Sequence, residues 1–219
     1  GTYFGGVNYF NPEYEIYTRY KVGDTEKAGL SSPIVGRMTE DKDGNLWIGT
    51  EGGGLNYYNR RTHEFKWYRP QEGRNSISHN NVKALYYDTT KEIIWIGTHL
   101  GGLNKLDIRS GQFTHYRMET DNPETLPSDI IRDIVPYQDL LIIATQNGVC
   151  LFNPANGKCQ QLFKDSKEGR SIKMVADVEF DKDGTLWIAA TGEGVFSYRF
   201  DTHKLNNYHY DPTFPNSLS

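Results

Sequence analysis

The chain has 219 residues, of which 37% are hydrophobic and 13% aromatic, a composition that can build a packed core and argues against disorder. Its formal net charge is −4 with acidic and basic residues evenly mixed, which excludes the basic stripe that nucleic-acid binding needs. No run of 18 apolar residues and no signal peptide is present, so we expect membrane attachment only through a segment outside this chain.

An apolar pentapeptide recurs along the sequence. Leu46-Trp47-Ile48-Gly49-Thr50 returns in related form at Ile94, Leu141 and Leu186, after intervals of 48, 47 and 45 residues. The glycine-rich segment that follows it also recurs, as in Gly53-Gly54-Leu55-Asn56. A repeat of this length, built from short apolar strands and glycine-rich turns, predicts the blades of a β-propeller.

One repeat predicts four antiparallel strands. In the best-defined copy they are Val35 to Glu40, Leu46 to Thr50, Leu55 to Asn59 and Glu64 to Tyr68. The second strand is apolar at nearly every position, which indicates burial on both faces between neighbouring blades. In the later copies we expect first strands at Val82 to Tyr87, Ile130 to Val135 and Met174 to Phe180, and fourth strands at Gln112 to Tyr116, Cys159 to Phe163 and Lys204 to Tyr208.

The predicted fold is therefore all-β, a β-propeller segment of four complete blades and one partial N-terminal blade from a larger ring. The expected ranges are a partial blade at 1–32 and blades at 33–77, 78–127, 128–171 and 172–219. Gly1-Thr2 aligns with Gly49-Thr50, so we expect the chain to begin inside a strand. Open blade faces at both ends would expose apolar residues, which predicts self-association as a homodimer.

Three tryptophans occupy one position of the repeat. Trp47, Trp95 and Trp187 stand in the second strand of their copies, and Ile142 replaces them in the copy at 128–171. A large aromatic residue that returns at the blade period is expected to be a structural wedge between adjacent sheets.

The two cysteines lie on neighbouring strands of one predicted hairpin. A disulfide between Cys150 and Cys159 is one interpretation. Cys159, however, takes the apolar core position filled elsewhere by Phe65 and Phe113. Because a free cysteine behaves as a small buried hydrophobic residue, register favours two buried thiols.

Four elements recur in order: the N-S-[LI]-S lead-in, D-x-D-G-[NT]-L-W-I-[GA]-T, G-G-[LV]-N and F-x-x-Y. Together they resemble the two-component regulator propeller repeat, over the whole chain. The resemblance implies a periplasmic sensor propeller of about seven blades, in a protein anchored in the inner membrane that also carries a histidine kinase. It further implies an oligosaccharide signal, transcription regulation and control of polysaccharide use. The copy at 128–171 departs, because it lacks the Trp and Pro136-Tyr137-Gln138-Asp139 replaces D-x-D-G.

The turns between second and third strands hold candidate ligand-binding residues. Side chains at this position differ between copies while their surroundings repeat, which fits either a binding surface or an ordinary variable turn. The mixture of rings and hydrogen-bonding groups suits an oligosaccharide. The candidates in these turns are Tyr3, Phe4, Glu51, His99, Gln146, Asn147 and Glu193. Arg74 and Arg170, in the links between blades, could pair with an acidic sugar.

The sequence gives little support for catalysis, a metal or a cofactor. Asp41-Lys42-Asp43-Gly44-Asn45 resembles the start of a calcium loop, but Gly52 stands where the closing glutamate belongs, so a hairpin turn is expected. No H-E-x-x-H or G-x-S-x-G motif is present. Asp133 has no evident partner carboxylate for glycoside cleavage. We therefore expect a sensor rather than an enzyme, with a protein-interaction scaffold or, less favoured, a glycan-cleaving enzyme as alternatives.

Overall fold

The computed structural model describes residues 7–11, 16–164, 172–213 and 217–218. Over these residues the regular secondary structure consists of β-strands, arranged as one two-stranded and four four-stranded sheets. Strands that follow one another in the chain lie side by side and antiparallel within each sheet. The chain divides into two compact units, Gly1–His115 and Tyr116–Ser219.

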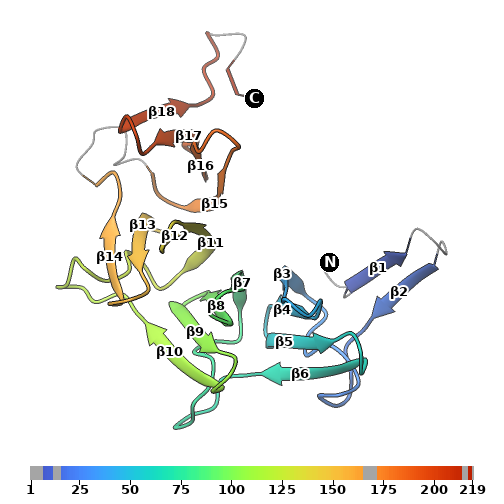
Figure 1. Cartoon of the computed structure of the whole chain (residues 1–219). Helices are drawn as coiled ribbons and strands as arrows, with labels where there is room; N and C mark the ends of the chain where they lie inside the picture. Colours follow the sequence, from blue (N-terminus) through green and yellow to red (C-terminus); the bar gives the residue numbers. More distant parts are fainter. Residues whose placement is uncertain (1–6, 12–15, 165–171, 214–216, 219) are drawn as a thin grey trace. The chain divides into compact units, whose positions relative to one another are not determined.

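The first unit begins with the two-stranded sheet and continues with two four-stranded sheets (Figure 1). Their strands are β1 (Val7–Asn11) and β2 (Ile16–Tyr20); β3 (Val35–Glu40), β4 (Leu46–Thr50), β5 (Gly54–Asn59) and β6 (Glu64–Tyr68); and β7 (Val82–Asp88), β8 (Ile93–Thr98), β9 (Leu103–Asp107) and β10 (Gln112–Tyr116). The first strands of the two larger sheets, β3 and β7, pack against each other.

The second unit holds the other two four-stranded sheets. Their strands are β11 (Ile131–Tyr137), β12 (Leu140–Thr145), β13 (Gly148–Asn153) and β14 (Lys158–Gln161); and β15 (Val175–Phe180), β16 (Leu186–Ala190), β17 (Gly194–Arg199) and β18 (Lys204–Tyr208). Here the first strands β11 and β15 pack against each other. All four larger sheets have the 1-2-3-4 strand order of propeller blades, which confirms the predicted all-β propeller architecture.

Three strands, β5, β7 and β15, differ from the bounds that the repeat predicts by one residue at one end. Two others, β11 and β14, differ by more, for identifiable reasons. β14 covers Lys158–Gln161 instead of Cys159 to Phe163, and Phe163 has a φ of 64°, which is incompatible with a strand. β11 extends to Tyr137 because a two-residue turn, with Gln138 at φ 54°, lets Tyr137 pair with Leu140. Each sheet lies inside one predicted blade range, and the boundaries within the links remain predictions.

The D-x-D-G segments form tight turns between first and second strands. The Asp41 carboxylate accepts hydrogen bonds from the amides of Asp43 (3.0 Å) and Asn45 (2.9 Å), while Gly44 has a φ of 80°. Asp181 repeats this arrangement with Asp183 (3.0 Å) and Thr185 (2.9 Å). The carboxylate thus satisfies turn amides, as expected of a hairpin turn.

The sheets pack through the apolar side chains of their inner strands. In the first unit, Trp47 belongs to a buried cluster that includes Val82, Ile94 and Leu106 of the following sheet. Trp95 is equally buried. Trp187 differs, because it is only partly buried and its indole N–H donates to the Asp181 carboxylate at 2.8 Å. The position predicted to be a wedge is thus filled by a buried ring in two copies and by a half-exposed ring in the third.

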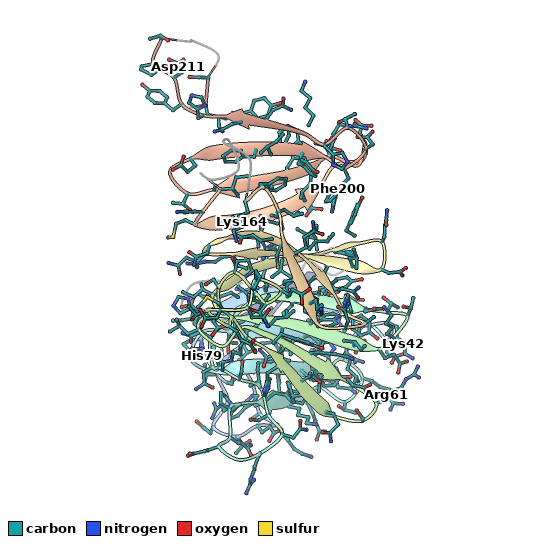
Figure 2. The ribbon with its side chains drawn as sticks, turned by 90° about the vertical axis from the view of Figure 1, so that its left-hand side faces the viewer. Lys42, Arg61, His79, Lys164, Phe200 and Asp211 are labelled. Atoms are coloured by element: carbon teal, nitrogen blue, oxygen red, sulfur yellow. The ribbon has the colours of Figure 1, made fainter. Side chains whose placement is uncertain are left out.

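The two ends of the strands form two different surfaces. Figure 2 labels Lys42 and Arg61, which lie in the turns after β3 and β5, on one side of the first unit. His79, which precedes β7, lies on the opposite side. The turns between second and third strands belong to the His79 side, because antiparallel strands alternate in direction. The candidate ligand-binding turns therefore occupy one surface of each unit.

The turn after β4 provides a matched pair of glycines for testing this packing. Gly52 and Gly54 have φ of 81° and 80°, but a Cβ on Gly54 would lie 2.3 Å from the Tyr68 carbonyl oxygen, whereas a Cβ on Gly52 would meet nothing within 4 Å. We predict that Gly52→Ala lowers the free energy of unfolding by about 1 kcal/mol through backbone strain alone. Gly54→Ala should cost at least about 2 kcal/mol more because the clash adds to that strain. Urea denaturation of both variants measures the difference, and equal losses would contradict this packing.

Candidate functional site

The turns after the second strands are held by one backbone hydrogen bond that recurs in all four larger sheets. In each case the amide that follows the strand donates to the carbonyl of the residue before the first strand. The pairs are Glu51 to Ile34 (3.0 Å), His99 to Asn81 (2.9 Å), Gln146 to Ile130 (3.0 Å) and Thr191 to Met174 (3.2 Å). The same backbone hydrogen bond is therefore made at these positions, although the turn after β12 is one residue shorter than that after β4, while the side chain is in turn a carboxylate, an imidazole, an amide and a hydroxyl.

A buried threonine closes three of these turns from within. The hydroxyls of Thr50, Thr98 and Thr145 donate to the carbonyls of Gly54 (2.8 Å), Gly102 (3.0 Å) and Gly148 (2.8 Å). Ala190 takes this position in the last sheet and has no hydroxyl. The first three turns consequently have an additional constraint that limits their conformational freedom.

In the first unit, Asn81 joins the Glu51 turn to the His99 turn. Its side-chain oxygen accepts the amide of Gly52 at 2.6 Å, and its carbonyl accepts the amide of His99 at 2.9 Å. Glu51 also forms an ion pair with Lys83, the second residue of β7. Both side chains of this ion pair are partly exposed, which limits its contribution to stability. The structure thus brings the predicted residues Glu51 and His99 together around Asn81.

In the second unit, Gln146 and the turn after β16 are joined through Met174. The Gln146 carbonyl accepts the Met174 amide at 2.7 Å, and the Met174 carbonyl accepts the Thr191 amide at 3.2 Å. Asn147 is held by two hydrogen bonds. Its side-chain amide donates to the Pro127 carbonyl (3.3 Å), and its backbone carbonyl accepts from the Gln161 side chain (3.1 Å).

Glu193 lies in the same unit on an open hollow. Its side chain is exposed. The hollow has a volume of about 650 Å³ and is also lined by Asn207, His209, Tyr210 and Leu218. A carboxylate, an amide and two aromatic rings around one hollow can hydrogen-bond and stack on a polar ring.

Of the remaining predicted residues, Arg74 is the one that the structure describes. Tyr3, Phe4 and Arg170 lie outside the described residues. Arg74 is exposed, and its guanidinium donates to the Gln71 side chain at 3.2 Å within the same link. The contact that the structure gives the Arg74 guanidinium thus lies within its own link.

Sequence reasoning missed Asn81, Lys83 and Met174. Met174 has 44% of its surface exposed and a φ of 49°, which is unusual for a side chain of its size. These residues stand at or beside the start of a first strand, next to the varied turns. The signal that could have found them is variation at that position, since Ile34, Asn81, Ile130 and Met174 are equivalent.

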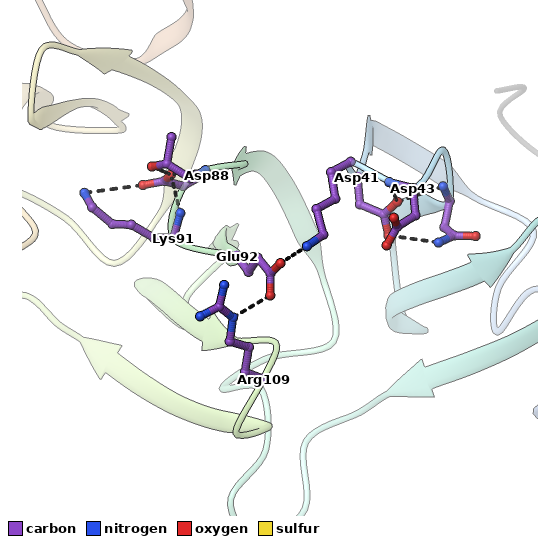
Figure 3. Close-up of polar contacts among 9 residues, drawn as sticks. Asp41, Asp43, Asp88, Lys91, Glu92 and Arg109 are labelled. Atoms are coloured by element: carbon purple, nitrogen blue, oxygen red, sulfur yellow. Dashed lines mark hydrogen bonds and ion pairs between the residues drawn. The ribbon is translucent and has the colours of Figure 1, made fainter.

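A second hollow, of about 350 Å³, lies at the other end of the strands in the first unit. Trp47, Tyr57, Tyr68, Lys66 and the Asp41 turn line it. Burial raises the pKa of Tyr57, and the Asp41 carboxylate adds to the shift. At its rim Glu92 accepts from Lys42 and from Arg109 (2.6 Å), as Figure 3 shows. The Glu92 charge is thus already neutralised by protein cations.

Asp133, considered for glycoside cleavage, has a structural role. It is buried, and its carboxylate oxygens accept the amides of Ile134 (3.0 Å) and Val178 (3.4 Å). The second of these bonds joins β11 to β15. Within the described ranges there is no cluster of three or more His, Cys, Asp or Glu side chains able to hold a metal ion. The same ranges contain no helix with the length and apolarity to cross a membrane.

The family model described as two component regulator propeller matches residues 29–52. This segment contains the lead-in, β3, β4 and the Glu51 turn. The chain carries the two-component regulator propeller repeat. The other three larger sheets share its strand order and its turn hydrogen bond, so the repeat accounts for the recurring architecture.

Solved structures of propeller regions resemble most of the chain. The extracellular domain of the hybrid two-component system BT3049 from B. thetaiotaomicron matches with a TM-score of 0.77 and 22% identity, over 93% of this chain and 27% of that one. The extracellular domain of BT4673 from the same organism matches with a TM-score of 0.73 and 25% identity, over 97% and 29%. The chain thus spans under a third of each structure. No curated protein matches its sequence.

The junction at Asn81 generates a test of the site geometry. We predict that Asn81→Ala lowers the free energy of unfolding by about 1 kcal/mol, because the Gly52 amide loses its acceptor. Asn80→Ala is the matched control, since Asn80 contributes its backbone carbonyl to Gly54 and its substitution should cost less than about 0.5 kcal/mol. Chemical denaturation measures both. Equal losses in the two variants would show that the Asn81 side chain does not hold the turn.

Proposed function

We propose that this chain is part of the extracytoplasmic sensor region of a hybrid two-component signalling protein, and that it recognises a ligand without transforming it. The presence of the two-component regulator propeller repeat and the likeness to the extracellular domains of BT3049 and BT4673 support this assignment. A periplasmic location and anchoring in the inner membrane belong to the same proposal.

The observation that carries the proposal is the contrast between backbone and side chain in the turns after the second strands. One hydrogen bond fixes the turn in all four larger sheets, yet the side chains there, three of them half-buried and that of Thr191 exposed, differ in charge and shape. Functional residues commonly lie on loops held by a rigid scaffold. Within one unit, a surface of this kind can present a different group from each blade to an irregular polar molecule.

We further propose that the ligand is an oligosaccharide and that its recognition controls the use of polysaccharides. The side chains of Glu51, His99, Gln146, Asn147 and Glu193 provide hydrogen-bonding groups and one flat ring. Sugars combine hydroxyl groups with apolar ring faces, so they are suited to such a mixture.

A panel of oligosaccharides that differ in charge and linkage tests this assignment. A ligand that binds only the folded state at 100 times its Kd stabilises the protein by about 2.7 kcal/mol. We predict a selective increase in Tm for one sugar class, and a smaller increase in the His99→Ala variant. Thr114→Ala, an exposed substitution on β10, is the control and should retain the full shift.

The alternatives give different results in the same experiment. An interaction scaffold would show no shift with any sugar and would bind a protein partner instead. A glycan-cleaving enzyme would release products. Asp133 is a poor candidate for such a reaction, because its carboxylate already accepts hydrogen bonds from the backbone amides of Ile134 and Val178.

We also propose that the outer face of the β15–β18 sheet associates with a second copy of the chain. A cavity of about 520 Å³ there is lined by Trp187, Val195, Tyr208 and Leu218, among other residues, and Tyr208 and Leu218 are 45% and 41% exposed. The equivalent Trp47 is covered by the next sheet, so this type of face is complementary to another blade. We predict concentration-dependent dimers in sedimentation experiments, and mostly monomers for Trp187→Asp. A wild-type monomer at high concentration would contradict the proposal.

A further inference from the structure

Two cysteine sulfur atoms lie close together inside the β11–β14 sheet. The Sγ atoms of Cys150 and Cys159 are 2.8 Å apart, and both residues are buried, with 0% and 5% of their surface exposed. Cys159 pairs with Phe152 in the ladder, two residues from Cys150, so the two thiols are diagonal neighbours on one face. A disulfide bond of about 2.05 Å needs a movement of under about 1 Å from this geometry.

Both cysteines replace residues that have structural roles in the other blades. Cys150 occupies the asparagine position of G-G-[LV]-N, and there the side chains of Asn56 and Asn104 accept the amides of Ser31 and Ser78 (2.8 Å each). Those bonds tie the lead-in to the third strand of the same sheet. The β11–β14 sheet lacks this asparagine. The β15–β18 sheet lacks it too, since Phe196 takes the position, and in the β11–β14 sheet the two cysteines make a contact between the third and fourth strands instead.

We propose that Cys150 and Cys159 form a disulfide that closes the β13–β14 hairpin when the protein folds in an oxidising compartment. The two thiols lose two protons and two electrons, and a disulfide-bearing oxidant accepts them and becomes two thiols. Exchange proceeds through a mixed disulfide, in which one cysteine thiolate attacks the oxidant and the second cysteine displaces it. The proposal revises the sequence-based preference for two separate thiols, because the diagonal register does not keep the sulfur atoms apart.

Burial determines when this oxidation takes place. Burial raises the pKa of Cys150 well above its ordinary value, and the contact with Cys159 adds to the shift. The thiolate that exchange requires is therefore scarce once the sheet has packed. The bond accordingly forms before the hairpin is covered, and afterwards resists mild reductants because they cannot reach the sulfur atoms.

The crosslink would also hold one of the candidate turns. Gln161, two residues after Cys159, donates its side-chain amide to the Asn147 carbonyl, and the Cys159 amide donates to the Glu124 carbonyl at 2.7 Å. When β14 is held in place, the Gln161 side chain is held too, and it positions Asn147, the neighbour of Gln146, through this hydrogen bond. In this way the disulfide stabilises the Gln146–Asn147 turn as well as the hairpin.

Thiol labelling of the complete chain tests the proposal. The protein is folded in a glutathione redox buffer, unfolded at neutral pH in denaturant that contains excess N-ethylmaleimide, which traps free thiols, and digested for mass spectrometry. We expect a linked peptide containing Cys150 and Cys159, with neither cysteine alkylated. Alkylation of both cysteines would overturn the proposal. A linkage between two chains would also overturn it, because the proposed bond lies within one hairpin.

Stability gives an independent measurement. Closure of a short loop by a disulfide raises Tm by several degrees, about 5 °C for a chain of this size. We expect complete reduction in denaturant, followed by refolding with reductant, to lower the wild-type Tm by this amount. The double variant Cys150→Ala/Cys159→Ala is the control, and its Tm should not respond to reductant. An unchanged wild-type Tm after verified reduction would contradict the stabilising role.

Discussion

The structure depends on the backbone bond that links the end of each second strand to the start of each first strand. It fixes the turn after β4, β8, β12 and β16 in the same way, with distances from 2.9 to 3.2 Å. Since backbone groups make this bond, any side chain is compatible with it. The repeat can therefore keep its architecture while the exposed residue at each turn changes, which is the property that a recognition surface requires.

Packing between sheets is the second constraint, and it explains why the same residue types recur at equivalent positions of the repeats. Trp47 fills the space between two sheets of the first unit, and buried threonines close the turns that follow. In the second unit Ile142 replaces the tryptophan in β12 and Ala190 replaces the threonine in β16, while the Asp133 carboxylate makes a contact between β11 and β15. The scaffold thus tolerates local substitution where a neighbouring group replaces the lost contact.

The sequence was sufficient to predict the strands, their order and the turn positions, because the same apolar segments and turn residues return about every 47 residues in the same order. It could not predict contacts that depend on side-chain placement between neighbouring segments. Asn81 was missed since its role arises from two turns distant in sequence. Trp187 was expected to be buried like Trp47, but its environment depends on what covers the sheet. Likewise, the place of Cys159 at a position that is aromatic in other repeats indicated that it is buried. It did not indicate that its sulfur atom lies close to that of Cys150.

Amide hydrogen exchange by NMR tests the central claim most directly. If the recurring bond holds all four turns, the amides of Glu51, His99, Gln146 and Thr191 should exchange slowly despite lying in turns at the protein surface. Their protection should be similar to that of amides within the second strands. Exchange of these four amides at the rates of an unstructured peptide would show that the turns are not fixed by a common backbone bond, and would contradict the account.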